Sequence, residues 1–180
     1  MQGENSEIKF GTDGWRAVIG DNYNFKNLRI LAQATADYIG KGKKIVIGFD
    51  TRFMSDKFAQ VVAEVLSNNA IKTVLSDRPV PTPALSLAVK QMKADLGIMI
   101  TASHNPAEYN GFKIKMPSGG AAPIEVTKAI ENLLDENTPA ENSEKAVPVE
   151  KMETMCMTSP CKSAMADSAQ LKIFPSPSPM

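Results

Sequence analysis

The sequence predicts an α/β fold with three layers, αβα, around a mostly parallel mixed sheet. Three short apolar runs, at 44–50, 73–75 and 96–101, have the length and composition of buried strands. Segments with helical spacing of apolar residues separate these runs. Strands that alternate with helices form βαβ units, and such units give parallel sheets with helices on both faces.

Four amphipathic segments are the expected helices. They cover about residues 25–39, 55–66, 82–92 and 126–134. Ser55 or Asp56 is the expected N-cap of the second helix. Pro83 predicts the start of the third helix, because proline at the first helical position loses no useful hydrogen-bond donor. The segment 111–116 is expected to add one edge strand, which we expect to be antiparallel.

A change in composition near residue 137 divides the chain into a predicted domain, 1–137, and a tail, 138–180. Prolines recur in the second part, at positions 139, 148, 160, 175, 177 and 179, and proline interrupts helices and strands. Ser and Met are frequent there without a period, so we expect the tail to be poorly ordered. Out-of-frame translation after about residue 145 is one interpretation of this tail, and a divergent linker is the other.

The overall composition excludes several classes of protein. The formal net charge is zero, which argues against a nucleic-acid binder, because such proteins carry a basic surface. No apolar run approaches the roughly 20 residues that span a bilayer, and the first eight residues lack a signal peptide's apolar stretch. We therefore expect a cytoplasmic protein without a membrane partner. Cys156 and Cys161 are the only cysteines and His104 is the only histidine, so neither a disulfide framework nor a zinc site is expected.

The segment Thr101-Ala102-Ser103-His104-Asn105-Pro106 follows the expected central strand directly. Open α/β sheets bind their ligands at the carboxyl ends of strands. A polar turn without chemistry is the alternative interpretation of these six residues alone. The segment continues through residues 107–115, in which Asn110-Gly111 is a tight-turn signal that we expect to fold Lys113 back toward Ser103.

A second segment, at residues 10–17, reads Phe-Gly-Thr-Asp-Gly-Trp-Arg-Ala. Its two glycines allow the backbone to approach an anion closely, and Arg16 offers a planar guanidinium for a phosphate. Three further stretches stand out: Gly-Phe-Asp-Thr-Arg at 48–52, Pro-Val-Pro-Thr-Pro-Ala at 79–84 and Gly-Ile-Met-Ile at 97–100.

Taken together and in this order, the segments from about residue 8 to residue 136 resemble domain I of the α-D-phosphohexomutases, the phosphoglucomutase/phosphomannomutase family. The resemblance implies an isomerase of carbohydrate metabolism, an intramolecular phosphotransferase that interconverts hexose 1-phosphates and hexose 6-phosphates through a phosphoserine and a bisphosphorylated sugar. Ser103 is then the residue that becomes phosphorylated. His104 and Lys113 occupy positions used for proton transfer and phosphate contact, and Arg16, Thr101 and Asn105 complete the expected phosphate-binding set.

Two more residues receive a supporting role from the resemblance. Asp13 and Arg52 are expected to orient the serine loop, and a simple turn or helix-cap role is the alternative for each. The family also implies Mg²⁺ and an activator of the glucose 1,6-bisphosphate type. A metal-binding Asp-Gly-Asp-x-Asp-Arg pattern is absent from the sequence, so the phosphate on Ser103 is the one metal ligand expected here.

The resemblance covers the first of the family's four domains. We therefore expect the chain to be an N-terminal fragment of a mutase and to be inactive by itself. A non-catalytic phosphosugar-binding module is one alternative. The other is one subunit of a split mutase that receives domains II–IV in trans. Which hexose phosphate is used depends on the third domain and is not predicted.

Overall fold

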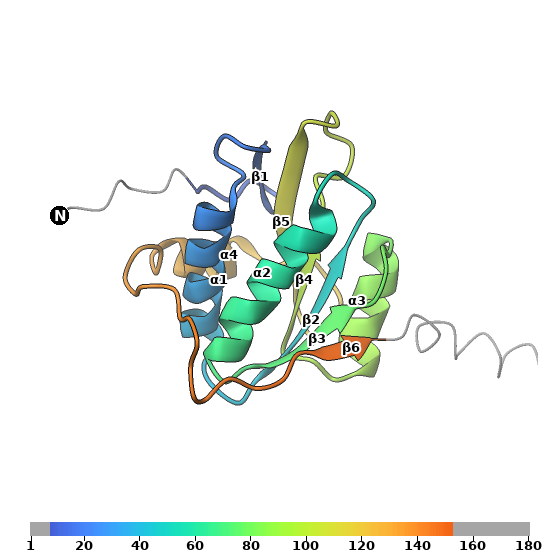
Figure 1. The fold of residues 1–180 in the computed structure, drawn as a ribbon. Coiled ribbons are helices and arrows are strands. Elements are labelled where there is room, and N and C mark those ends of the chain that lie inside the picture. The colour runs from blue at the N-terminus through green and yellow to red at the C-terminus, as the bar shows by residue number, and fades with distance from the viewer. Residues whose placement is uncertain (1–7, 153–180) are drawn as a thin grey trace, which may run out of the picture.

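A six-stranded mixed sheet forms the middle layer of the protein (Figure 1). The computed structural model describes residues 8–152. Its strands are β1 (Trp15–Val18), β2 (Lys44–Phe49), β3 (Lys72–Ser76), β4 (Leu96–Ile100), β5 (Tyr109–Lys115) and β6 (Glu150–Met152). Their order across the sheet is β1-β5-β4-β2-β3-β6.

The three apolar runs form a parallel unit, with β2 between β3 and β4. Val46 of β2 pairs with Val74 on one side and with Gly97 on the other. Every residue of β4 is buried, which agrees with its continuous apolar sequence. Because β2 and β4 run in the same direction, Asp50 and Thr101 leave the sheet at the same edge, and the Asp50 N–H donates to the Ile100 carbonyl at 3.1 Å.

The antiparallel part of the sheet differs from the expectation in its position. The strand expected at 111–116 is β5, which pairs antiparallel with β4 as expected. It is not an edge strand, because β1, which the sequence did not predict, pairs with its other side. Asn110 and Gly111 lie inside β5 rather than in a tight turn. Gly111 is needed for packing there, since a Cβ would lie 2.6 Å from the Thr101 carbonyl oxygen.

Four helices cover the two faces of the sheet, at positions close to the expected ones. They are α1 (Phe25–Ile39), α2 (Ser55–Asn68), α3 (Thr82–Gln91) and α4 (Ile124–Glu131). Helices α1, α2 and α4 lie on one face of the sheet and α3 lies on the other (Figure 1), and their buried side chains belong to two separate core clusters. The predicted three-layer α/β class is therefore confirmed.

The predicted N-cap of α2 is wrong. Met54 occupies the N-cap position, with a left-handed backbone (φ 58°) and no side-chain cap. Ser55 is the first helical residue, and its hydroxyl donates to Asp50 Oδ1 at 2.8 Å instead. The Ser55 hydroxyl therefore binds Asp50, the residue that follows β2, and does not cap α2.

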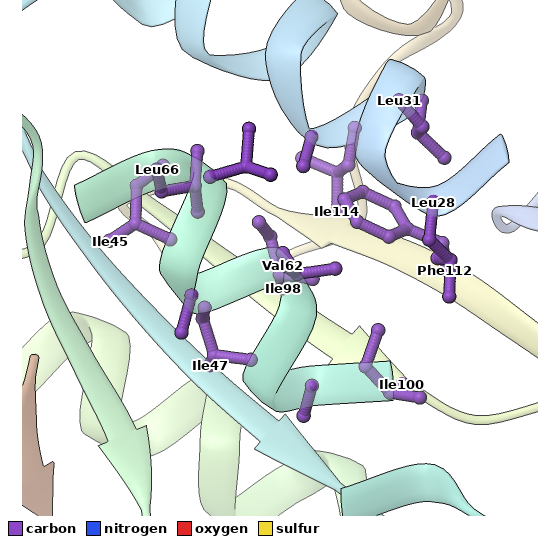
Figure 2. Packing of buried hydrophobic residues seen from close by; sticks show 14 of the residues in the cluster. Leu28, Leu31, Ile45, Ile47, Val62, Leu66, Ile98, Ile100, Phe112 and Ile114 are labelled. Atoms are coloured by element: carbon purple, nitrogen blue, oxygen red, sulfur yellow. The ribbon is translucent and has the colours of Figure 1, made fainter. Parts of the chain in front are cut away.

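The larger core lies between the sheet and the helices α1, α2 and α4. Figure 2 shows aliphatic side chains of the two helices α1 and α2 meeting those of β2, β4 and β5. The labelled residues are Leu28, Leu31, Ile45, Ile47, Val62, Leu66, Ile98, Ile100, Phe112 and Ile114. The smaller core on the opposite face joins α3 to Val46 of β2, Val74 of β3, Met99 of β4 and Met152 of β6. This two-sided packing fixes the strand ends from which the site is built.

Residues 138–152 continue the packed structure beyond the expected boundary at 137. The Ala140 N–H donates to Gln33 Oε1 of α1 at 2.9 Å, and the Ser143 N–H donates to Asn68 Oδ1 of α2 at 3.2 Å. The segment leads to β6, which pairs parallel with β3 and buries Met152. The boundary itself stays a prediction, and the remainder of the tail, with Cys156 and Cys161, lies outside the described residues, as does the N-terminal segment 1–7. Within residues 8–152, no helix is both long and apolar enough to cross a membrane.

Candidate functional site

The serine loop, residues 101–108, connects β4 to β5 at the edge where β2 also ends. Ser103 and His104 are exposed, while Thr101 and Ala102 are buried. A hollow of about 540 Å³ opens beside the loop, lined by Ser103, Asn105 and Ala107 together with residues 50–53. The hollow therefore lies between the loops that follow β2 and β4, where α/β sheets bind ligands.

Ser103 has an unusual backbone conformation. Its φ is 59°, in the left-handed region, which costs a residue with a Cβ about 1–2 kcal/mol. Its N–H donates to Thr101 Oγ1 at 2.9 Å, and the Thr101 hydroxyl donates to Asp50 Oδ2 at 2.5 Å. The Thr101 hydroxyl, expected to bind phosphate, is thus already used to hold the loop.

Arg52 binds the same loop through its main-chain carbonyls. Nη2 donates to the Ser103 and Asn105 oxygens at 2.8 and 2.6 Å. Nη1 donates to the Pro106 and Tyr109 oxygens at 2.7 and 3.0 Å. Nε lies 3.4 Å from Asp50 Oδ2. The expected orienting role of Arg52 thus has a defined set of contacts.

A second polar cluster lies at β1 and β5 and gathers three cations around Asp13. Lys113 Nζ donates to Asp13 Oδ2 at 2.6 Å, Lys115 Nζ is 3.9 Å from Oδ1, and Arg16 Nη2 is 3.9 Å from Oδ2. Burial raises the pKa of the Asp13 carboxyl, but the Lys113 hydrogen bond and the three positive charges outweigh it and leave the pKa below its ordinary value. Lys113 and Lys115 are nearly buried, so their charges are held in place.

Gly14 allows this cluster to form. Its φ is +99°, and a Cβ at this position would lie 2.6 Å from the Phe112 carbonyl oxygen and 2.8 Å from Lys113 Cγ. Only a residue without a side chain lets the turn that carries Asp13 approach β5 so closely.

The structure therefore divides the predicted site residues into two groups. Ser103, Thr101, Asn105 and Arg52 lie together at the serine loop, and Arg16, Lys113 and Asp13 lie together at β1 and β5. In the described range, no hydrogen bond or ion pair joins Ser103 to a residue of the second group. His104 is exposed on the loop. The catalytic roles assigned to these residues stay predictions.

Three residues of these surroundings were not predicted as site residues. Asp50 accepts hydrogen bonds from Thr101, Ser55 and Arg52. Its position, as a charged residue directly after a buried strand, could have indicated it as a site residue. Lys115 joins the second cluster, and its spacing of two from Lys113 on one strand places both on the same face. Phe53, 70% exposed at the hollow, carried no signal in the sequence.

The described residues do not fit a magnesium site. No group of three or more His, Cys, Asp or Glu side chains that could hold a metal occurs between residues 8 and 152. Asp50 already accepts hydrogen bonds from Thr101 and Ser55 and from the Arg52 N–H. A hard divalent cation needs several oxygen ligands held together, so this part of the chain does not supply them.

Comparisons with known proteins identify the domain. The family model for the phosphoglucomutase/phosphomannomutase alpha/beta/alpha domain I matches residues 7–141. A phosphoglucomutase of Staphylococcus saprophyticus is 39% identical over 144 residues, which are 77% of this chain and 26% of that protein. A phosphoglucomutase of Staphylococcus aureus is 36% identical over 141 residues, 75% of this chain and 26% of that protein.

Solved structures agree with the sequence relatives. A Thermus thermophilus protein assigned as a phosphomannomutase superposes with a TM-score of 0.78 at 38% identity, covering 88% of this chain and 36% of that one. The open form of the Paramecium phosphoglucomutase pp63/parafusin shares the fold, with a TM-score of 0.68 at 18% identity over 88% of this chain and 34% of that one. The chain spans about a quarter of the length of the curated relatives it matches. The chain belongs to the phosphoglucomutase/phosphomannomutase family, and its residues 7–141 are the family's alpha/beta/alpha domain I.

Proposed function

We propose that this chain supplies the serine-bearing domain of a phosphohexomutase and that Ser103 is its phosphoryl carrier. The supporting observation is the exposed Ser103 on a loop whose backbone is fixed by Arg52 and Thr101. Phosphoryl transfer depends mainly on positioning and charge stabilisation. A carrier hydroxyl on a rigid loop beside an open hollow fits that requirement.

In the proposed reaction, the phosphoserine gives its phosphoryl group to the free 1- or 6-hydroxyl of a hexose phosphate. The P–O bond to Ser103 Oγ breaks as a P–O bond to the sugar forms, and the proton of the sugar hydroxyl is transferred to Ser103 Oγ. The bisphosphorylated sugar then turns around and returns its other phosphoryl group to Ser103. The net result is an isomerisation without loss of phosphate.

The other predicted residues have roles that follow from their chemistry. Arg16 and Lys113 contribute positive charge for phosphate oxygens, and the exposed His104 imidazole is suited to carry a proton. Asn105 borders the hollow beside Ser103 and offers an amide for hydrogen bonds. We also propose that the complete enzyme contains domains II–IV and acts on hexose phosphates. It would use Mg²⁺ and an activator of the glucose 1,6-bisphosphate type.

A chimaera tests the proposal. Residues 8–141 replace the corresponding domain of the Thermus thermophilus protein, which is 38% identical, and a coupled assay follows glucose 1-phosphate conversion to glucose 6-phosphate. We expect turnover that disappears in Ser103→Ala and persists in Ser118→Ala, a substitution of another exposed loop serine. Turnover that survives Ser103→Ala would refute the assignment.

The chain by itself is the second part of the test. We expect no conversion above that of Ser103→Ala, because the residues described do not form the metal site. Calorimetry with glucose 1-phosphate and glucose 6-phosphate then distinguishes the alternatives. Tight binding by the chain alone, without phosphorylation of Ser103, would favour a phosphosugar-binding module instead.

A further inference from the structure

The hydrogen-bonding capacity of Arg52 is fully used inside the protein. A guanidinium has five N–H groups and no acceptor. Four of these donate to the carbonyls of Ser103, Asn105, Pro106 and Tyr109, and Nε faces the Asp50 carboxylate. No N–H group is left for a phosphate, although Arg52 borders the hollow beside Ser103.

All four carbonyls belong to the loop and its junction with β5. They span residues 103–109, so one side chain connects the start of this segment to its end. Carbonyls that converge on one point need a planar donor with several N–H groups. The loop is thus wrapped around the guanidinium, and its shape depends on this one side chain.

Ser103 is held at both of its peptide groups. Its N–H donates to Thr101 Oγ1 and its carbonyl accepts from Arg52 Nη2. A non-glycine residue keeps a left-handed φ only where its surroundings fix it from several sides. The direction of the Cα–Cβ bond of Ser103, and with it the position of Oγ, follows from that backbone conformation.

Asp50 links the two restraints. Its Oδ2 accepts from the Thr101 hydroxyl at 2.5 Å and lies 3.4 Å from Arg52 Nε. Its Oδ1 accepts from the Arg52 N–H at 3.0 Å and the Ser55 hydroxyl at 2.8 Å. The carboxylate therefore fixes the guanidinium to the end of β2 and the start of α2, which are rigid elements.

We propose that Arg52, anchored by Asp50, is a positioning residue that holds Ser103 in its left-handed conformation and so aims the hydroxyl that carries the phosphoryl group. The proposal rests on the proposed function only in its last clause. The conformational part concerns the loop alone and is tested without any turnover. Arg52 acts through Ser103 and does not contact the sugar phosphate.

Solution NMR of the full chain, labelled with ¹³C and ¹⁵N, measures the conformation directly. The Cα and Cβ shifts of Ser103 and its N–H to Hα coupling report φ. We expect a left-handed Ser103 in the native chain and its loss in Arg52→Ala. The Asn105 and Tyr109 amides donate within the loop. In Arg52→Ala they should exchange with solvent roughly tenfold faster or more, because the free-energy cost of a left-handed residue corresponds to a factor of about this size.

Addition of small cations distinguishes a specific role of the guanidinium from a general loosening of the loop. Methylguanidinium added to Arg52→Ala should restore the Ser103 signals, and methylammonium should not. Arg52→Lys keeps the charge but offers one ammonium, which cannot reach four carbonyls, so it should lose the left-handed signals as well. This variant also serves if Arg52→Ala does not fold.

Arg78→Ala is the matched control, because Arg78 is exposed and pairs with Asp77. The Ser103 signals of this variant should be those of the native chain. Unchanged Ser103 signals in Arg52→Ala or Arg52→Lys would overturn the proposal, as would equal rescue by methylammonium. If the loop results hold but the chimaera turns over without Ser103, the carrier assignment fails and the loop restraint stands.

Discussion

Replacement of Gly14 by alanine tests how tightly the turn with Asp13 packs on β5. Gly14 has φ +99°, and the new Cβ would lie 2.6 Å from the Phe112 carbonyl oxygen and 2.8 Å from Lys113 Cγ. The carbonyl belongs to the sheet and cannot move away from the new Cβ, and the Lys113 side chain is nearly buried and bound to Asp13. Two costs therefore add: the positive φ, about 1–2 kcal/mol, and the steric overlap, about 1–3 kcal/mol.

Gly20→Ala is the matched control for the backbone cost. Gly20 has φ +88°, and nothing lies within 4 Å of a Cβ built there. The effect of alanine on the unfolded chain is the same in both variants. Urea unfolding should therefore give a free energy of unfolding about 1–3 kcal/mol lower for Gly14→Ala than for Gly20→Ala. Equal values for the two variants would refute the close packing of this turn.

Three further predictions concern stability, the first two measured by urea unfolding and the third by thermal unfolding. Because the pKa of Asp13 is lower in the folded state, the ionised carboxylate stabilises the fold fully above about pH 4, and this stabilisation is lost as the pH falls through the folded pKa. The difference in free energy of unfolding between the native chain and Asp13→Asn should therefore shrink toward pH 2. A constant difference would contradict the ion cluster. Tyr23→Phe removes a buried hydrogen bond to the Gly111 carbonyl and should cost about 0.5–1.5 kcal/mol, whereas no loss would mean that the bond is not formed. A chain that ends at residue 137 should melt lower than one that ends at 152, since it loses β6 and the burial of Met152; equal melting temperatures would support the predicted boundary at 137.

The parallel part of the fold could be predicted because its signals are local. Each of the strands β2, β3 and β4 is a short apolar run, and each helix has its own apolar face. These elements need no information from distant residues. The order β4-β2-β3 was not predicted, because β3 and β4 follow one another in the chain but lie on opposite sides of β2, whereas consecutive strands are usually neighbours.

The elements that were missed depend on distant partners. β1 has four residues, of which only Trp15 is buried, and it becomes a strand because β5 offers a free edge. β6 has three residues and depends likewise on β3. Asn110-Gly111 has the composition of a turn, but Gly111 was required for close packing against Trp15 and Thr101. Composition alone does not distinguish these two uses of glycine.

The candidate site shows the same division. Motifs identified the residue types of the serine loop and the cation cluster, but spacing could not say that, within residues 8–152, no hydrogen bond or ion pair would join Ser103 to the cations. The serine loop is complete as it stands: Arg52, Thr101 and Asp50 satisfy one another. The cation cluster is not complete, because three cations share one carboxylate and Arg16 Nε is buried without a hydrogen-bond partner.

A buried donor without a partner costs about 1–3 kcal/mol, and excess positive charge in a partly buried cluster adds to that cost. An anion at this cluster would offset the excess positive charge. The two clusters therefore differ in that the serine loop is ordered by its own hydrogen bonds without a ligand, whereas the cation cluster keeps an excess of positive charge. Under the proposed function, the cations of β1 and β5 are the groups that a phosphate of the substrate would neutralise.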